Sequence, residues 1–137
     1  MFTVFGFYKF QKMNNLKKNQ KLLNNLFFNK GINGSIIISK EGLNGSLSGK
    51  NKDIKASIIR LKKILNIKKF DSFNNSISKF KPFHKPKVKI KKEVVPMNFL
   101  LHSKERNIKT HLSPKKWNEL IKKKDTHIIE TRKRFEL

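Results

Sequence analysis

The stretch that decides the fold is "GSIIISKEGLNGSLSG", residues 34–49. Its first part is short, apolar and β-branched, so we predict a strand over 34–39 that is buried on both faces. Its second part contains Gly42, Asn44 and Gly45, residue types that tolerate a positive φ. The Asn44-Gly45 pair predicts a tight hairpin that leads into another strand over 45–49. We expect Glu41 to pair with a neighbouring lysine or to cap this loop.

The same glycine-rich turn has an alternative interpretation as an anion-binding nest, because such turns expose backbone N–H groups. However, it lacks the Lys-Ser/Thr ending of a nucleotide-binding P-loop, and no helix is expected directly after it. We therefore favour a structural hairpin motif made of Glu41, Gly42, Asn44 and Gly45.

The segment before this stretch predicts a strand and a helix. "TVFGFYKF" at 3–10 is dominated by aromatic and β-branched residues, which is typical of a strand. Apolar residues then recur at near-helical spacing from an N-cap at Asn14 or Asn15 to a stop at Gly31.

The segment after it predicts a second helix and a further strand. Asn51 or Asp53 can cap a helix that places apolar residues along one side and lysines elsewhere. "FDSFNNSISKF" at 70–80 shows a weak alternation that predicts a strand. The order strand, helix, hairpin, helix, strand is that of an α+β, ferredoxin-like βαββαβ fold, in which two helices cover one face of the sheet.

A basic stretch, "KFKPFHKPKVKIKKEVV", follows at 79–95. Val88 and Ile90 alternate with lysines, which predicts an extra strand that is apolar on one face and cationic on the other. Pro86 keeps the start of this strand out of a central position. Lysines on one face of a strand lie about 6.6–7 Å apart, comparable to successive phosphates along a nucleic-acid strand.

We therefore predict that this stretch binds RNA, with lysines on phosphates and aromatic rings stacked on bases. The alternative is that Phe80 and Phe83 belong to the core and that the lysines only protect an edge strand from aggregation. The predicted nucleic-acid-binding residues are Lys81, Lys85, Lys87, Lys89, Lys91, Lys92, Phe83 and His84.

The last third of the chain predicts one more helix and one more strand. Ser113 as N-cap and Pro114 at the first helical position predict a helix over 114–124, with Trp117, Leu120 and Ile121 as its apolar stripe. "HIIETRKRFEL" at 127–137 is expected to be a buried strand that turns into a basic loop.

Composition points to a polyanionic partner. The chain has 33 Lys and Arg against 9 Asp and Glu, a formal net charge of +24 over 137 residues. Such a charge attracts nucleic acid, although drift toward A/T-rich codons for Lys, Asn and Ile is an alternative source of the lysines.

Several classes of protein and site are not supported. There is no cysteine, which rules out disulfides, thiolate catalysis and Cys-ligated zinc. The four histidines lie far apart, no G-x-S-x-G elbow is present, and neither a secretory signal nor a membrane span is found. The residues alone therefore predict a cytoplasmic binding module without a metal or a catalytic site.

The ordered set "FYKF", "GSIIISKEGLNGSLSG", "FKPFHKPKVKIKKEVV", "LSPKKWNELI" and "HIIETRKRFEL" resembles the N-terminal half of the bacterial rhodanese-domain tRNA wobble-uridine hydroxylases. Lys87 and the run from Val88 to Glu93 match the family's basic strand, and Trp117 and Asn118 match its helix. Thr131 and Arg132 fall on the segment that opens the rhodanese domain in that family.

The resemblance implies an acylphosphatase-like, ferredoxin-type domain over 1–95, a linker over 96–124 and the truncated start of a rhodanese domain over 125–137. It further implies tRNA as partner, 5-hydroxylation of uridine with molecular oxygen as co-substrate, and a catalytic cysteine in a rhodanese domain. Because this chain has no cysteine, we expect it to be the tRNA-binding portion, inactive unless that domain is supplied, for example as a separately encoded partner.

Two other functions are alternatives for this sequence. The chain could be a stand-alone, non-catalytic RNA-binding module, which the same basic strand would serve. An acylphosphatase-type hydrolase would need glycine and arginine in an anion-cradling loop after the first strand. "KFQKMNNLKK" at 9–18 has neither, which argues against hydrolysis.

Overall fold

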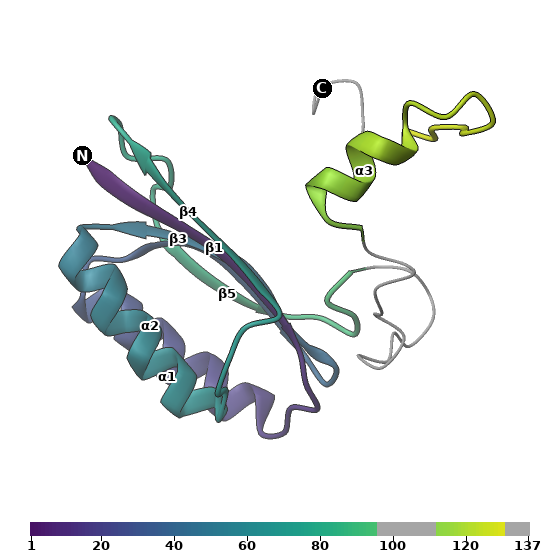
Figure 1. Ribbon diagram of the computed structural model, residues 1–137. Helices are drawn as coiled ribbons and strands as arrows, with labels where there is room; N and C mark the ends of the chain where they lie inside the picture. The colour runs from purple at the N-terminus through teal and green to yellow at the C-terminus, as the bar shows by residue number, and fades with distance from the viewer. Residues whose placement is uncertain (96–111, 131–137) are drawn as a thin grey trace. The chain divides into compact units, whose positions relative to one another are not determined.

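The computed structural model describes residues 1–95 and 112–130, which belong to two compact units, Met1–Ser103 and Lys104–Leu137. The first unit contains seven helices and strands within its described residues (Figure 1). In chain order these are β1 (Phe2–Phe10), α1 (Leu16–Asn29), β2 (Asn33–Ser39), β3 (Gly42–Gly49), α2 (Asn51–Leu65), β4 (Ser72–Ser78) and β5 (Pro86–Ile90).

The strands form one sheet in the order β4-β1-β3-β2-β5. Neighbouring strands are antiparallel except β2 and β5, which are parallel. Both helices lie on one side of this sheet, where α1 packs against β5 and β2, and α2 packs against β1 and β3 (Figure 1). This arrangement confirms the predicted α+β, ferredoxin-like fold with an extra strand.

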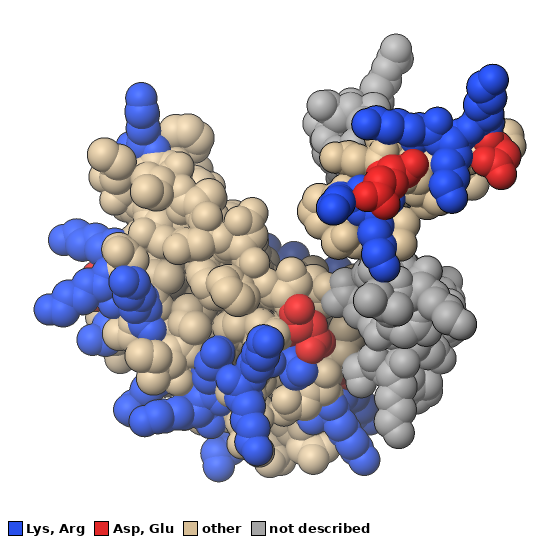
Figure 2. All heavy atoms as spheres, in the orientation of Figure 1, with Lys and Arg blue, Asp and Glu red and all other residues tan. Residues whose placement is uncertain are grey.

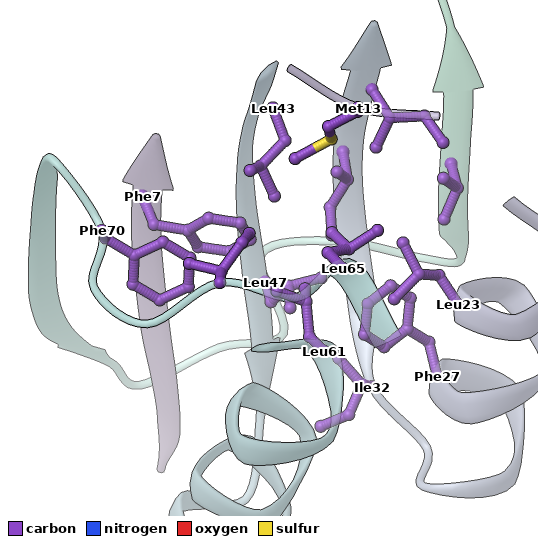
Figure 3. Close-up of a cluster of buried hydrophobic side chains, with 14 of the residues drawn as sticks. Phe7, Met13, Leu23, Phe27, Ile32, Leu43, Leu47, Leu61, Leu65 and Phe70 are labelled. Atoms are coloured by element: carbon purple, nitrogen blue, oxygen red, sulfur yellow. The ribbon is translucent and has the colours of Figure 1, made fainter. Parts of the chain in front are cut away.

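The core fills the layer between the helices and the sheet (Figure 3). Leu23 and Phe27, four residues apart on α1, are both buried, and Leu61 and Leu65 repeat this spacing on α2. Between α2 and the β1 side of the sheet, the rings of Phe7 and Phe70 lie with their centroids 4.9 Å apart. Among the described residues of the first unit, no helix covers the opposite face of the sheet, which we call the open face.

The hairpin lies earlier than the sequence predicts. Ser39 pairs with Gly42, so the turn consists of Lys40 and Glu41, and β3 begins at Gly42. Asn44 and Gly45 are therefore inside the strand, and the tight turn predicted at that pair is wrong. Gly42 is the residue that the turn requires, because its φ is 152° and an added Cβ would lie 2.1 Å from the Lys9 carbonyl oxygen.

Gly45 is required for a different reason from the one expected. Its φ is not positive, but a Cβ there would lie 2.7 Å from the Ser35 carbonyl oxygen and 2.8 Å from Cγ1 of Ile36. The central strand β3 can approach β2 this closely because the side chain is missing.

Other local expectations also need correction. Neither predicted cap forms on α2, where Lys50 is the N-cap and Asn51 the first helical residue. Asn15 is the N-cap of α1 but has φ 53° and makes no capping hydrogen bond through its side chain. From Asn33 to Ile38, β2 is buried on alternate residues rather than on both faces, and Ser39 beside the turn is buried as well.

In the second unit, α3 spans Pro114–Leu120. Oγ of Ser113 accepts a hydrogen bond from the Lys116 N–H at 3.4 Å, which confirms the predicted helix start. The helix ends at Leu120 and does not continue to residue 124 as predicted. Beyond its end, Oγ1 of Thr126 donates a hydrogen bond to the Leu120 carbonyl at 2.8 Å. The predicted apolar stripe of the helix is not buried.

The buried strand predicted over 127–137 is not seen where the structure describes it. Residues 127–130 form no strand and are exposed, because no described strand pairs with them. Thr131, Arg132 and the rest of that prediction lie outside the described residues. None of the helices in the described ranges combines the length and apolar character needed to cross a bilayer.

Replacing Gly45 with Val should destabilise the protein by about 1–3 kcal/mol, because the new side chain overlaps the Ser35 carbonyl and Ile36. Thermal unfolding measures the loss. Gly6→Ala is the matched control, since a Cβ at that strand glycine meets only Oγ of Ser46 at 3.4 Å. Equal melting temperatures for the Gly45→Val variant and the parent would contradict the close approach of β2 and β3.

Candidate nucleic-acid interface

The basic strand β5 presents its lysines on one side. It lies at the edge of the sheet beside β2, with Ile36 opposite Val88. Val88 faces the helices and is only 5% exposed, whereas Lys87 and Lys89 on either side of it are exposed. The alternation predicted from the sequence is confirmed at Val88, whereas Ile90, predicted on the same apolar face, is 37% exposed. Successive lysines on the other side are about 6.6–7 Å apart.

Lys89 lies between two other lysines of this stretch, and both affect its charge. The ammonium of Lys87 lowers the pKa of Lys89, and partial desolvation, the charge of Lys91 and a hydrogen bond with Lys87 lower it further. Like charges disfavour the protonated form of the middle lysine. A bound anion would relieve this repulsion. We call Lys87, Lys89 and Lys91 the lysine row.

Backbone contacts hold the lysine row in place. Nε2 of Gln20 on α1 donates to the Val88 carbonyl at 2.7 Å, and the Lys91 N–H donates to the Ile38 carbonyl at 3.0 Å. Oε1 of Glu41 accepts a hydrogen bond from the Val94 N–H at 2.6 Å. Glu41 therefore ties the hairpin turn to the segment after β5, and the lysine pair expected for it is not seen in the described part of the chain.

The other predicted site residues lie next to the lysine row in sequence but on different structures. Residues 79–85 connect β4 to β5 and include Lys81, Phe83 and His84. Phe83 is half-buried and His84 is exposed, while Phe80 is 73% exposed and so is not a core residue. The Lys85 carbonyl accepts a hydrogen bond from the Gly34 N–H at 3.2 Å, and Lys92 directly follows the lysine row.

The face of the sheet opposite the helices carries an aromatic pair that the sequence interpretation missed. Phe7 points to the core, so by the alternation of a strand Tyr8 and Phe10 point to the other face. Both are half-buried, and their ring centroids are 6.0 Å apart at 66°. The alternation within "FGFYKF" was sufficient to find this pair, once Phe7 was known to be buried.

Small polar residues surround the aromatic pair. On this open face Tyr8 lies between Asn44 of β3 and Ser72 of β4 in the register of the sheet. Serine and asparagine side chains in this position offer hydrogen-bond donors and acceptors without adding bulk. The open face thus combines aromatic rings on β1, polar groups on the neighbouring strands and lysines at the β5 edge.

The described residues offer no comparable site for metal or hydrolytic chemistry. Residues 1–95 and 112–130 contain no group of three or more His, Asp or Glu that could hold a metal ion. The loop between β1 and α1, residues 11–15, has neither glycine nor arginine.

Comparisons with known proteins agree on the family and the fold. Residues 2–94 match the family described as UPF0176 acylphosphatase like domain. The chain is 59% identical over 136 residues to the tRNA uridine(34) hydroxylase of Pelagibacter ubique (strain HTCC1062), which covers 99% of this chain and 45% of that protein. It is 34% identical over 126 residues to the tRNA uridine(34) hydroxylase of Rickettsia bellii (strain OSU 85-389), covering 90% of this chain and 50% of that protein. The chain thus spans about half the length of the curated relatives it matches.

Among solved structures, Klebsiella pneumoniae BlrP1 in its manganese and cy-diGMP complex at pH 9.0 is similar in fold. The TM-score is 0.51 at 12% sequence identity, over 67% of this chain and 24% of that one. This likeness concerns the fold alone.

The lysine row makes a specific prediction for titration. Lys87→Gln should raise the pKa of Lys89 toward its ordinary value, because it removes the largest cause of the lowering. NMR of the lysine Cε and Nζ nuclei during a pH titration measures this change. Lys92→Gln, which removes the same charge from a lysine that does not perturb Lys89, should leave that pKa unchanged. An unchanged pKa of Lys89 in the Lys87→Gln variant would mean that the ammonium groups of Lys87 and Lys89 are not neighbours.

Proposed function

Because this chain belongs to the UPF0176 acylphosphatase-like domain family, we propose that it is the N-terminal, tRNA-binding portion of a tRNA uridine(34) hydroxylase. The relatives named tRNA uridine(34) hydroxylase, which align with 90–99% of this chain, support tRNA as the substrate class. The observation that carries the proposal is the lysine row, in which Lys87 and Lys89 lie exposed on one side of the edge strand β5 and Lys91 follows directly after its end.

The lysine row suits the backbone of an RNA strand. A row of three cations at phosphate-like spacing can neutralise successive phosphates and release their counterions. Such contacts position RNA without reading its sequence. Lys81, Lys85 and Lys92 extend the positive charge before and after the row.

Bases can be held on the open face at β1, which β3 and β2 separate from the lysine row. Tyr8 and Phe10 offer ring faces for stacking, and each stacked base contributes about 1–3 kcal/mol. Stacking requires unpaired bases, so the surface suits a loop of a folded RNA better than its helical stems. Phe83 and His84 in the segment before β5 provide further rings at the end of the sheet.

The chemistry of hydroxylation is assigned to another part of the enzyme. This chain has no cysteine, so the catalytic cysteine of a rhodanese domain must come from the length of the relatives that the chain does not span. We propose that the present chain holds tRNA for such a domain, which could be encoded separately. Molecular oxygen would be the co-substrate of the assembled enzyme, and the cytoplasm, where tRNA is found, its location.

Replacing Lys87, Lys89 and Lys91 together by Gln should weaken tRNA binding and reduce the log–log slope of affinity against salt by about 2 to 3, because three phosphate contacts are lost. Fluorescence anisotropy with labelled tRNA over a range of salt concentrations measures both. The matched control replaces Lys52, Lys55 and Lys63 on α2, which removes the same charge from the opposite side of the sheet. Equal losses in the two triple variants would show that only net charge matters.

Phe10→Leu should weaken binding of single-stranded RNA by about tenfold and leave the salt slope unchanged, because it removes a ring and no charge. The same anisotropy assay measures this. Phe28→Leu is the control, since Phe28 is 79% exposed on α1, away from the open face. A Phe10→Leu variant that binds like the parent would remove the aromatic pair from the interface.

A further inference from the structure

The two edges of the sheet differ in how they are protected from pairing with another chain. β5 begins with Pro86, carries two exposed lysines, and has a carbonyl occupied by Gln20, all of which discourage a further strand. β4, "SFNNSIS", has no proline and no charged residue in a chain of net charge +24. Within the described residues β4 pairs with β1 alone, so its outer row of backbone groups is open.

The side of β4 that faces the helix layer is apolar and exposed. Phe73 and Ile77 are 62% and 73% exposed, although Phe73 stacks on Phe5 with ring centroids 5.7 Å apart. Ile59 on α2 is 60% exposed and lines a groove together with Phe5, Ile58 and Asn75. Contiguous exposed apolar residues of this kind mark interaction sites.

β4 itself carries no charge, while Lys55 of α2 lines the groove beside it and Asp71 and Lys79 flank the strand. Figure 2 shows the surface along β4 in tan, whereas the blue atoms of Lys and Arg gather over the helices. A partner chosen by charge would be expected at the lysine-rich surfaces. The β4 edge therefore suits an uncharged strand.

The sequence of β4 is complementary to itself. When two antiparallel copies are centred on Asn75, Phe73 lies opposite Ile77, Asn74 opposite Ser76, and Ser72 opposite Ser78. On the helix side, Phe73 and Ile77 thus meet each other on either side of a central pair of Asn75 side chains, and on the open face polar residues meet polar residues. This pattern is what a two-fold symmetric contact requires, because the same patch must fit itself.

We propose that β4 pairs antiparallel with β4 of a second copy of this chain, around a two-fold axis at Asn75. The pairing joins two sheets into one and places the helices of both copies on the same side. It buries Phe73 and Ile77 of each copy against the other. The lysine rows lie at the two far edges, so the most concentrated like charges are kept apart.

A single introduced cysteine tests the register, because the chain has no cysteine of its own. Asn75→Cys should form a disulfide-linked dimer under mild oxidation, since directly opposed residues have Cα atoms about 4.5–5.5 Å apart, within disulfide range. Ser72→Cys, on the same strand, should not, because the two copies of residue 72 would lie about 20 Å apart. No cross-link at residue 75, or equal cross-linking at both positions, would overturn the proposal.

A charge tests the same contact without oxidation. Ile77→Lys should weaken self-association by at least about tenfold, because a cation replaces an apolar side chain opposite Phe73. Ile129→Lys, at a position 85% exposed in the second unit, adds the same charge and should not. Analytical ultracentrifugation measures both, and circular dichroism confirms that the variants fold.

Salt separates this contact from RNA binding. Raising the salt concentration should strengthen the dimer, because it screens two chains of the same sign, whereas it weakens binding to RNA. A parent chain that stays monomeric in high salt, or an Ile77→Lys variant that still dimerises, would overturn the proposal. Neither result would affect the proposed binding of tRNA, which rests on the opposite edge and on the open face.

Discussion

Burial of Val88 under the helix layer determines on which side of β5 its charges lie. Side chains alternate along a strand, so with Val88 inside, the lysines on either side of it must point away from the core. A slip of one residue against β2 would turn the lysines into the apolar layer. The Gln20 side chain, which binds the Val88 carbonyl, and the pairing of Val88 with Ile36 oppose that slip. The lysine row, the protected edge and the open face all follow from this orientation.

Much of the fold could be predicted from the sequence because its patterns are local. The alternation in β5 and the Ser113-Pro114 helix start can each be recognised within a few residues. The first is confirmed at Val88 but not at Ile90, and the second is confirmed. The turn could not be placed, because Asn44-Gly45 is typical of a hairpin and the true reason for Gly45 is its contact with β2. The N-cap of α2 was also predicted wrongly. Asn51 is a residue type typical of N-caps, but it lies one position after the actual N-cap, Lys50.

The candidate site was predictable only in part. The lysines of β5 can be recognised from the local sequence alone. Tyr8 and Phe10 are distant from them in sequence, and only the strand order places both groups in the same sheet. The status of β4 as an edge depends on the same long-range order. The sheet therefore has two edges of different chemistry. The β5 edge is charged and is contacted by the Gln20 side chain, whereas β4 has no charged residue and its outer backbone groups are open.

The connection between β4 and β5 is short for the distance that it must cover. The two strands are consecutive in sequence but lie at opposite edges of five strands, a separation of about 19 Å. The eight steps from Ser78 to Pro86 reach about 26–29 Å when fully extended, so little slack is left. Pro82 and Pro86 favour the extended backbone that this requires. Insertions between residues 79 and 85 should therefore be tolerated, whereas a deletion of a few residues would pull one outer strand away from its neighbour.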